Sequence, residues 1–312
     1  MKKVDIIGIG EVVLDWVAMV PHFPKPDEKV DAVSENYFPG GVTANFLVAV
    51  SRLGVSSGFI GAVGDDSYGD FLINNFKKEN VDTTFTLKKT EMRTPVNFIF
   101  ISNGEKTIIQ SPHMKTTKIS VSELEESYIA ESKLLHTTII HPRVAERSIQ
   151  IAKEHNVKIS IDLEPQIAQR GWDSLKHILL KADILIPNKE GAKMITKCNT
   201  PEESANELIR RGIPMIIITL GAEGALLTTE DFQKKIPTFQ IEKIIDTTGA
   251  GDTFNGAFSV AYWIRRWNLE KSIRYANAAA SLKIQRLGAR TGMPSENELR
   301  KYILEKDPSF NM

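Results

Sequence analysis

Short apolar runs alternate with amphipathic segments along most of the chain. Six runs rich in β-branched residues have the length and composition of buried strands, and they occupy residues 4–10, 57–64, 133–140, 157–163, 182–188 and 214–221. Between many of them the apolar positions follow a helical period, at residues 43–54, 143–156 and 200–212. The last of these begins at Thr200-Pro201, an N-cap residue followed by proline. This alternation predicts an α/β fold, in which a mostly parallel sheet is flanked by helices on both faces.

Two segments interrupt the alternation. Residues 11–38 contain three prolines and show no helical period, and residues 93–112 hold two strand-like runs around Asn103-Gly104, a dipeptide typical of a hairpin turn. We predict that both segments form antiparallel strands of a small sheet outside the main layers, which acts as a lid. The predicted division is an α/β nucleotide-binding core at 1–10, 41–92 and 113–312, with a β lid over the substrate site at 11–40 and 93–112.

The composition restricts the class of protein. Of the 312 residues, 42% are hydrophobic and 25% are charged, and the 39 basic residues balance 39 acidic ones. This balance gives no electrostatic support to a nucleic-acid or membrane-surface partner. The single cysteine, Cys198, excludes an internal disulfide, and the apolar N-terminal run is interrupted at Asp5, Glu11 and Asp15. No apolar stretch approaches the roughly 20 residues that span a bilayer, so we predict a soluble cytoplasmic protein.

The stretch DTTGAGDTFNGAF, from Asp246 to Phe258, carries the candidate chemistry. A glycine-rich turn that leads into a helix collects free N–H groups and the positive end of the helix dipole, which together bind anions. No lysine follows the glycines as in a Walker A loop. Asp252 follows instead, and a carboxylate in this place suits an incoming hydroxyl group, whose proton it would accept as a general base. A plain helix cap with glycine in the turn explains the same residues, and these residues alone do not decide between the two interpretations.

This stretch resembles the C-terminal motif of the ribokinase-like (PfkB) carbohydrate kinases, and PGGVTANFLVAVSRLG, residues 39–54, resembles their N-terminal motif. Four further segments follow in the family's order, at residues 61–70, 185–191, 218–227 and 276–290. The resemblance covers nearly the whole chain and implies a kinase that uses ATP and Mg²⁺ to phosphorylate a hydroxyl group of a small carbohydrate. Ribose, fructose, 2-keto-3-deoxygluconate and other keto-sugars stay open, as does a nucleoside kinase of the same fold. The hairpin lacks the run YYR of the 2-keto-3-deoxygluconate enzymes, which argues mildly against an acid sugar.

The resemblance also implies residue roles. It makes Asp252 the catalytic base and gives the transferred phosphate an anion hole formed by Gly249, Ala250 and Gly251. The implied sugar-binding residues, in addition to Asp252, are Asp15, Gly40, Gly41 and Asn45. The implied nucleotide-binding residues are Asn188, Thr219, Gly221, Gly224 and Asn277. Without the resemblance, a plain turn and a solvated strand residue would be the simpler interpretations of Gly40-Gly41 and of Asp15.

Two positions depart from the family pattern. The family's Asn-x-x-Glu motif reads Asn188-Lys189-Glu190-Gly191 here, and a shift of one residue turns a helical side chain by about 100°. Glu190 is therefore an uncertain ligand to Mg²⁺ through water. The loop at Asp246, Thr248 and Gly288 matches a monovalent-cation site, but Gly292 stands where potassium-activated members have a serine. The resemblance also suggests a homodimer formed through the lid.

Other classes of protein have weaker support. Gly8-x-Gly10 lacks the third glycine of a dinucleotide-binding fingerprint, and Glu11 would lie against the pyrophosphate. The histidines at positions 113, 136 and 141 lack the spacing of metal ligands. A non-catalytic sensor would be expected to have lost its base, yet Asp252 is present.

Overall fold

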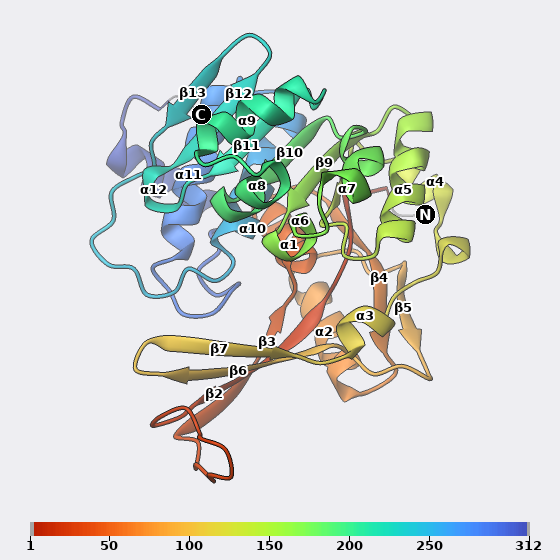
Figure 1. The fold of residues 1–312 in the computed structure, drawn as a ribbon, viewed down its shortest axis with the longest axis vertical. Helices are drawn as coiled ribbons and strands as arrows, with labels where there is room; N and C mark the ends of the chain where they lie inside the picture. Colours follow the sequence, from red (N-terminus) through yellow and green to blue (C-terminus); the bar gives the residue numbers. More distant parts are fainter. Residues whose placement is uncertain (1–2, 311–312) are drawn as a thin grey trace.

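The computed structural model describes residues 3–310, so the outermost residues of the predicted core, 1–2 and 311–312, lie outside the described part. One sheet has nine strands in the order β13-β12-β11-β10-β9-β8-β1-β4-β5, and a second sheet has four in the order β3-β2-β6-β7. The second sheet projects from one end of the main body (Figure 1). The nine strands are β1 (Ile6–Ile9), β4 (Ser57–Gly64), β5 (Thr86–Lys89), β8 (Leu134–Thr137), β9 (Lys158–Leu163), β10 (Ile184–Pro187), β11 (Met215–Thr219), β12 (Ala225–Thr229) and β13 (Gln233–Ile236).

The six strands predicted from the apolar runs are all present, as β1, β4, β8, β9, β10 and β11. These six strands and β5 pair with one another in parallel, whereas β12 pairs antiparallel with β11 and β13 pairs antiparallel with β12 at one edge. Their side chains alternate between two hydrophobic cores, so that Ile6 packs into one and Ile7 into the other. Because both faces are covered, the central strands are mainly apolar and do not alternate between apolar and polar residues.

Helices cover both faces of the main sheet. The helices α1, α2, α10, α11 and α12 contribute to one core, and α4 to α9 contribute to the other. The three predicted helical segments are confirmed as α1, α5 and α9, and α9 begins with a capping box between Thr200 and Glu203. The bounds are α1 (Val42–Arg52), α2 (Ser67–Lys78), α3 (His113–Thr116), α4 (Glu126–Ala130), α5 (Pro142–Glu154), α6 (Pro165–Ala168), α7 (Trp172–Leu179), α8 (Lys189–Thr196), α9 (Pro201–Arg210), α10 (Ala250–Ser259), α11 (Leu269–Lys283) and α12 (Glu296–Lys306).

The small sheet is built from β2 (Val13–Met19), β3 (Ser34–Gly40), β6 (Val96–Ser102) and β7 (Glu105–Gln110). The predicted hairpin is confirmed between β6 and β7, with positive φ angles of 50° at Asn103 and 82° at Gly104. The pairs β2–β3 and β6–β7 are antiparallel as expected, but the central pair β2–β6 is parallel. Strands β2 and β6 are parallel because both run away from the main body (Figure 1).

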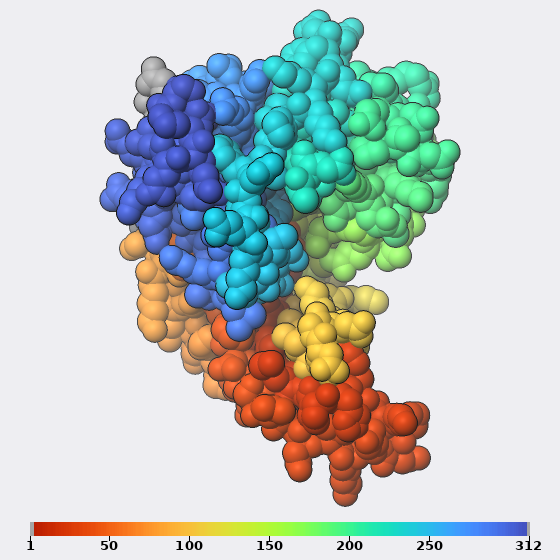
Figure 2. All heavy atoms as spheres, turned by 90° about the vertical axis from the view of Figure 1, so that its left-hand side faces the viewer, coloured from red at the N-terminus to blue at the C-terminus, as the bar shows by residue number. Residues whose placement is uncertain are grey.

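The small sheet lies at the end of the body where several functional candidates gather. In Figure 2 its strands, red and yellow, project from the rest of the molecule. Strands β1, β9, β10 and β11 are parallel, so their carboxyl ends meet at one edge of the main sheet, which is where ligands bind in open α/β sheets. No helix within residues 3–310 is both long enough and apolar enough to cross a membrane.

Candidate active site

The turn that leads into α10 has the geometry of an anion site. Gly249 has a positive φ of 79°, and a Cβ there would lie 2.5 Å from the carbonyl oxygen of Ala289, so glycine is required. A Cβ on Gly251 would meet no atom within 4 Å, so the turn faces open space at this residue. The first N–H groups of a helix have no acceptor within it and lie at the positive end of its dipole. The N–H of Ala250 donates to the carbonyl oxygen of Thr247 at 3.1 Å, so the turn faces open space at Gly251, directly before Asp252.

A chain of buried side chains holds Asp252 in place. Asn45 on α1 donates from Nδ2 to Oδ2 of Asp252 at 2.8 Å, and Arg290 donates from Nε to Oδ1 of Asn45 at 2.7 Å. An arginine can only donate, which fixes the orientation of the Asn45 amide. Arg290 also donates to Oδ1 of Asn75 at 2.6 Å and to the carbonyl oxygen of Gly40 at 3.0 Å. One arginine thus connects the small sheet, two helices and the candidate base.

The environment of Asp252 suits proton transfer near neutral pH. Burial raises the pKa of this carboxyl group to about 7, the hydrogen bond from Asn45 opposes the rise, and the charge of Glu164 adds to it. A general base works best when its pKa lies near the working pH. Asp252 therefore combines the position and the pKa that proton abstraction from a hydroxyl group requires.

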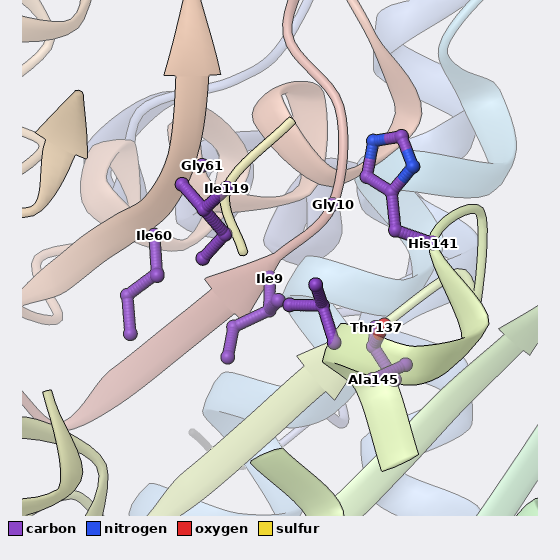
Figure 3. A pocket seen from close by; sticks show the side chains of 9 residues that line it. Ile9, Gly10, Ile60, Gly61, Ile119, Thr137, His141 and Ala145 are labelled. Carbon is purple, nitrogen blue, oxygen red and sulfur yellow. The ribbon is translucent and has the colours of Figure 1, made fainter. Parts of the chain in front are cut away.

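A cavity of 120 Å³ lies beside Asp252. Its walls come mainly from the carboxyl ends of β9 and β10 and from the first turns of α10, and they consist of Val42, Asp162, Glu164, Ile186, Asn188, Thr219, Gly251, Asp252 and Asn255. A smaller internal cavity of 10 Å³ lies beside His141 between Ile9, Ile60 and Ile119 (Figure 3). A space of that size holds about one water molecule. The cavity beside Asp252 is the candidate reaction site because the candidate base and Gly251 line it.

The small sheet contributes Asp15 and its partners. Asp15 is 8% exposed and accepts a hydrogen bond of 2.8 Å from Nδ2 of Asn97. A Cβ on Gly40 would lie 2.4 Å from the Asp15 carboxylate, so glycine leaves room for this acid. Burial raises the pKa of Asp15. Lys106 on β7 reaches Oγ1 of Thr248 at 3.4 Å, which joins the small sheet to the loop before α10.

The N-terminus of α1 is closed by the protein itself. Oε1 of Glu11, which follows β1, accepts from the N–H of Val42 at 2.9 Å, and its Oε2 accepts from the hydroxyl of Thr138 at 3.0 Å. Gly41 has a φ of 97°, and a Cβ there would lie 2.8 Å from the Glu11 carbonyl oxygen. Burial raises the pKa of Glu11 to about 8, and the charge of Glu164 adds to this. The N–H of Val42 is therefore not available to a phosphate, whereas the first turn of α10 faces open space at Gly251.

Two of the predicted nucleotide residues line the cavity. Asn188 directly follows β10, and Thr219 is the last residue of β11. The two residues lie side by side and pair as an isolated bridge. Oδ1 of Asn188 accepts from the N–H of Gly191 at 2.7 Å and so caps α8. The side chain of Asn188 thus has a structural task in addition to any contact with a ligand.

The other three predicted nucleotide residues lie farther along the same edge. Gly221 and Gly224 bracket the turn between β11 and β12, with φ angles of 62° and 94°. A Cβ on Gly221 would meet no atom within 4 Å, whereas on Gly224 it would lie 2.1 Å from the carbonyl oxygen of Ile236. Asn277 is buried and donates to the carbonyl oxygens of Ile236 and Pro237 at 3.2 and 3.1 Å. It therefore holds the chain after β13 and does not line the cavity.

The acidic groups of the cavity differ from those expected. Glu190 is exposed on α8 and does not line the cavity. A Cβ on Gly191 would lie 2.5 Å from the Leu163 carbonyl oxygen, so the packing of α8 leaves no room for the family's glutamate. Asp162 and Glu164 line the cavity instead, at the end of β9. Burial raises the pKa of Asp162 well above its ordinary value, and the charge of Glu164 adds to this.

The predicted cation loop is tied together by its own groups. The Asp246 carboxylate accepts from the N–H of Thr248 at 2.9 Å and from the N–H of Gly288 at 2.8 Å. Burial raises the pKa of Asp246, but these hydrogen bonds outweigh it, so that the net pKa is lowered. Asp246 is therefore a charged group whose two oxygens both have partners.

The family model for pfkB family carbohydrate kinases matches residues 3–296. The chain belongs to this family. Ribokinase of Haemophilus influenzae is 31% identical over 311 residues, covering 97% of this chain and 99% of the relative. The crystal structure of ribokinase from Thermotoga maritima has a TM-score of 0.85 at 30% identity and covers 96% of this chain and 99% of that one. A structure of Arabidopsis thaliana ribokinase complexed with ribose and ATP has a TM-score of 0.85 at 20% identity, covers 97% and 99%, and shares the fold.

Membership of the pfkB family confirms the predicted fold and enzyme class. This pfkB kinase is a phosphotransferase with a sugar hydroxyl as acceptor, and it has the large parallel sheet and the separate small sheet expected of it.

Several charged residues of the site in this pfkB kinase were not predicted from its sequence. They are Glu11, Asp162, Glu164, Lys283 and Arg290. For the first three a signal was present, because each follows or ends a strand whose carboxyl end faces the site. Arg290 and Lys283 carry no such signal, since both belong to the far end of the chain and reach the site only through the packing of α11 and its following loop.

Proposed function

We propose that this pfkB kinase transfers the γ-phosphate of ATP to a hydroxyl group of ribose or of a closely related small sugar. The observation that carries the proposal is the buried Asp252 carboxylate, held by Asn45 beside the open first turn of α10. Ribose is the first acceptor to test because ribokinase of Haemophilus influenzae is similar along nearly the whole chain, and Arabidopsis thaliana ribokinase, which shares the fold, was solved with ribose and ATP.

In this proposal the sugar lies between the small sheet and α1. Asp15 and Asn45 bind its hydroxyl groups, and Gly40 and Gly41 let the backbone approach it. Asp252 accepts the proton of the attacking hydroxyl group. The N–H groups of residues 249–251 stabilise the charge that develops on the transferring phosphoryl group. Closure of the small sheet would exclude water and so suppress hydrolysis of ATP.

The nucleotide lies along the carboxyl ends of β10 and β11 in this proposal. Asn188 and Thr219 border the cavity, and Gly221 leaves room for the nucleotide beside the β11–β12 turn. Gly224 lets this turn pack against the chain after β13, and Asn277 supports the same segment. The sheet edge is open at Gly221, where no atom lies within 4 Å of an added Cβ.

The acidic wall of the cavity fits a hydrated Mg²⁺ ion. Within residues 3–310 no three His, Cys, Asp or Glu side chains are placed to hold an ion directly. Mg²⁺ usually keeps several waters and binds through one or two carboxylates and the substrate phosphates. Asp162 and Glu164 provide two carboxylates, and Asn255, 2% exposed, brings a carbonyl oxygen without a partner. We propose that this set, rather than Glu190, holds the ion's water shell, which supplies neutralisation of the phosphate oxygens.

The test is acceptor-dependent formation of ADP. Purified enzyme is assayed with ATP, Mg²⁺ and ribose, fructose, 2-keto-3-deoxygluconate or adenosine. We expect the highest kcat/KM with ribose or a related sugar, and we expect Asp252→Asn to lower kcat by about 10²–10⁴-fold without loss of nucleotide affinity. Asp173→Asn, an acid with a side chain 92% exposed on α7, is the matched control. Preference for adenosine, or normal turnover in Asp252→Asn, would refute the proposal.

We also propose a homodimer through the outer face of the small sheet. Neighbours on a strand point to opposite faces, so Trp16 lies opposite to Asp15. Trp16 packs edge-on against Phe98 and Phe100 at 5.9 and 5.8 Å between ring centroids, and Phe98 is 37% and Tyr37 45% exposed. Exposed apolar patches of this kind mark contact surfaces. Light scattering should give a dimer for the wild type and a monomer for Phe98→Glu, and a wild-type monomer would contradict this proposal. The cytoplasmic location stays a prediction.

A further inference from the structure

Lys283 is a lysine whose ammonium group is enclosed by protein. It is the last residue of α11, and its side chain has 0% exposure. Burial of an ammonium group is strongly unfavourable unless anions and hydrogen bonds compensate for it. Nζ of Lys283 donates to the carbonyl oxygen of Asp246 at 2.7 Å and lies 4.0 Å from the Asp246 carboxylate. The charge is therefore placed inside the loop that leads to the anion hole.

The same loop is the one that resembles a monovalent-cation site. Its segments are joined by the Asp246 carboxylate, which accepts the N–H groups of Thr248 and Gly288. The N–H groups of Ile245 and Asp246 both donate to the carbonyl oxygen of Ile284, at 2.8 and 3.2 Å. A positive charge at this point neutralises Asp246 and holds the turn that precedes Gly249, which are the tasks a bound cation would perform.

The residues present do not fit an additional monovalent cation. The carbonyl oxygen of Asp246, an obvious ligand, is already engaged by Lys283. A Cβ on Gly292 would lie 2.2 Å from the Lys283 carbonyl oxygen, so no side chain at this position can supply a further oxygen ligand. A second positive charge beside the buried ammonium group would also be repelled.

We propose that the Lys283 ammonium group takes the place of the monovalent cation in this loop, so that the enzyme works without potassium. Lys283 is then a positioning residue, because it acts on the transferring phosphate through the loop 246–251 and touches no substrate itself. Burial lowers the pKa of Lys283, and the charges of Asp246 and Asp252 oppose this fall. Two quantities test this inference. The reaction rate depends on the proposed kinase activity, and the thermal midpoint does not.

The first experiment compares cations in the wild type. Enzyme freed of potassium, sodium and ammonium is assayed in tetramethylammonium chloride, which is then replaced by KCl at constant ionic strength. We expect the same rate and the same thermal midpoint at every potassium concentration. A saturable rise of either quantity with potassium would overturn the inference, whereas absence of kinase activity under all conditions would refute the proposed function and leave the thermal readout to decide.

The second experiment removes the Lys283 ammonium group and leaves its place in the loop empty. Lys283→Ala should lower kcat by about 10–10²-fold, because displacement of the reacting groups by 1 Å has this effect. Potassium or ammonium, but not tetramethylammonium, should restore the rate and raise the thermal midpoint of this variant, since a ligand that binds only the folded state stabilises it. Lys283→Met fills the space without charge and should stay slow with every cation. Lys301→Ala, whose lysine side chain is 80% exposed on α12, is the matched control.

Each result of the second experiment decides the question. If potassium or ammonium restores the lowered rate of Lys283→Ala but not that of Lys283→Met, the ammonium group of Lys283 replaces a cation. Equal activity of Lys283→Met and wild type would overturn it, because charge would then be dispensable. If Lys283→Ala does not fold, the Lys283→Met rate and the wild-type titration still test the inference.

Discussion

Arg290 offers the sharpest test of how the site is held together. Arg290→Lys keeps the positive charge but removes the guanidinium fork, which donates to Asn45 at 2.7 Å, to Asn75 at 2.6 Å and to the Gly40 carbonyl at 3.0 Å. The side chain is 5% exposed, so water does not readily replace these bonds. A lysine ammonium group can satisfy about one of the three acceptors. Two unsatisfied buried acceptors at about 1–3 kcal/mol each lower the free energy of unfolding by about 2–6 kcal/mol.

This loss has two measurable consequences. The thermal midpoint should fall by roughly 4–24 °C, since 1 kcal/mol corresponds to about 2–4 °C in a large domain. The kcat should fall by about 10²-fold even at temperatures where the variant is folded, because Asn45 loses the bond that orients it toward Asp252. Calorimetry and steady-state kinetics measure the two effects. Arg286→Lys in the same loop, with a side chain 61% exposed, is the control.

The two effects are separable in the Arg290 experiment. A variant that is less stable but has normal kcat would show that Asn45 keeps its position without Arg290. A variant with the same midpoint and kcat as Arg286→Lys would refute the reasoning altogether, because the three bonds would then contribute nothing.

Three further predictions concern the acids of the site. Since burial raises the pKa of Asp252 to about 7 and the base must be ionised, kcat/KM for the sugar should fall about tenfold per pH unit below that pKa; a flat profile between acidic and neutral pH would contradict the assignment. Asp15→Ala should raise the sugar KM by about 10–10²-fold and leave sugar-free nucleotide affinity unchanged, whereas equal weakening of both would mean that Asp15 supports the fold. Glu164→Gln should weaken Mn²⁺ binding by about 10-fold or more, measured by electron paramagnetic resonance with nucleotide present. Glu190→Gln should have little effect on Mn²⁺ binding. A larger loss in Glu190→Gln than in Glu164→Gln would assign the ion to Glu190.

The main sheet was predictable because burial on both faces leaves a plain signal. Strand β10 is apolar from Ile184 to Pro187, and all four of its residues are buried. The antiparallel edge carries no such signal. Strand β13, with the sequence QKKI, has three exposed residues out of four and resembles a polar loop. Edge strands are short and charged because this discourages pairing with other chains, and the same property hides them in the sequence.

The site was predictable only where a local motif exists. Asp252 and its glycines form one continuous stretch, so the turn, the helix start and the acid are visible together. The residues that orient this base do not form such a stretch. Asn45 and Arg290, which hydrogen-bond to each other, are separated by 245 positions in the chain. A single arginine or lysine in a sequence is most simply a solvated residue. Arg290 and Lys283 become buried only when α11 packs against α10 and the loop after α11 packs against α1.

The charges around Asp252 are unevenly distributed, and this bears on the form of nucleotide that binds. Arg290 and Lys283 lie near Asp252, while the cavity wall carries Asp162 and Glu164. Two like charges about 7 Å apart repel by roughly 2 kcal/mol at an effective dielectric constant of about 20, which is about a 30-fold loss of affinity. A neutral sugar is unaffected, but a triphosphate near an ionised acid of this wall is repelled unless a divalent cation accompanies it. ATP without Mg²⁺ should therefore bind at least about 30-fold more weakly than ATP with Mg²⁺, and Glu164→Gln should reduce that difference. Calorimetric titrations of both nucleotide forms measure it; equal affinities in the wild type would mean that the acidic wall does not face the phosphates.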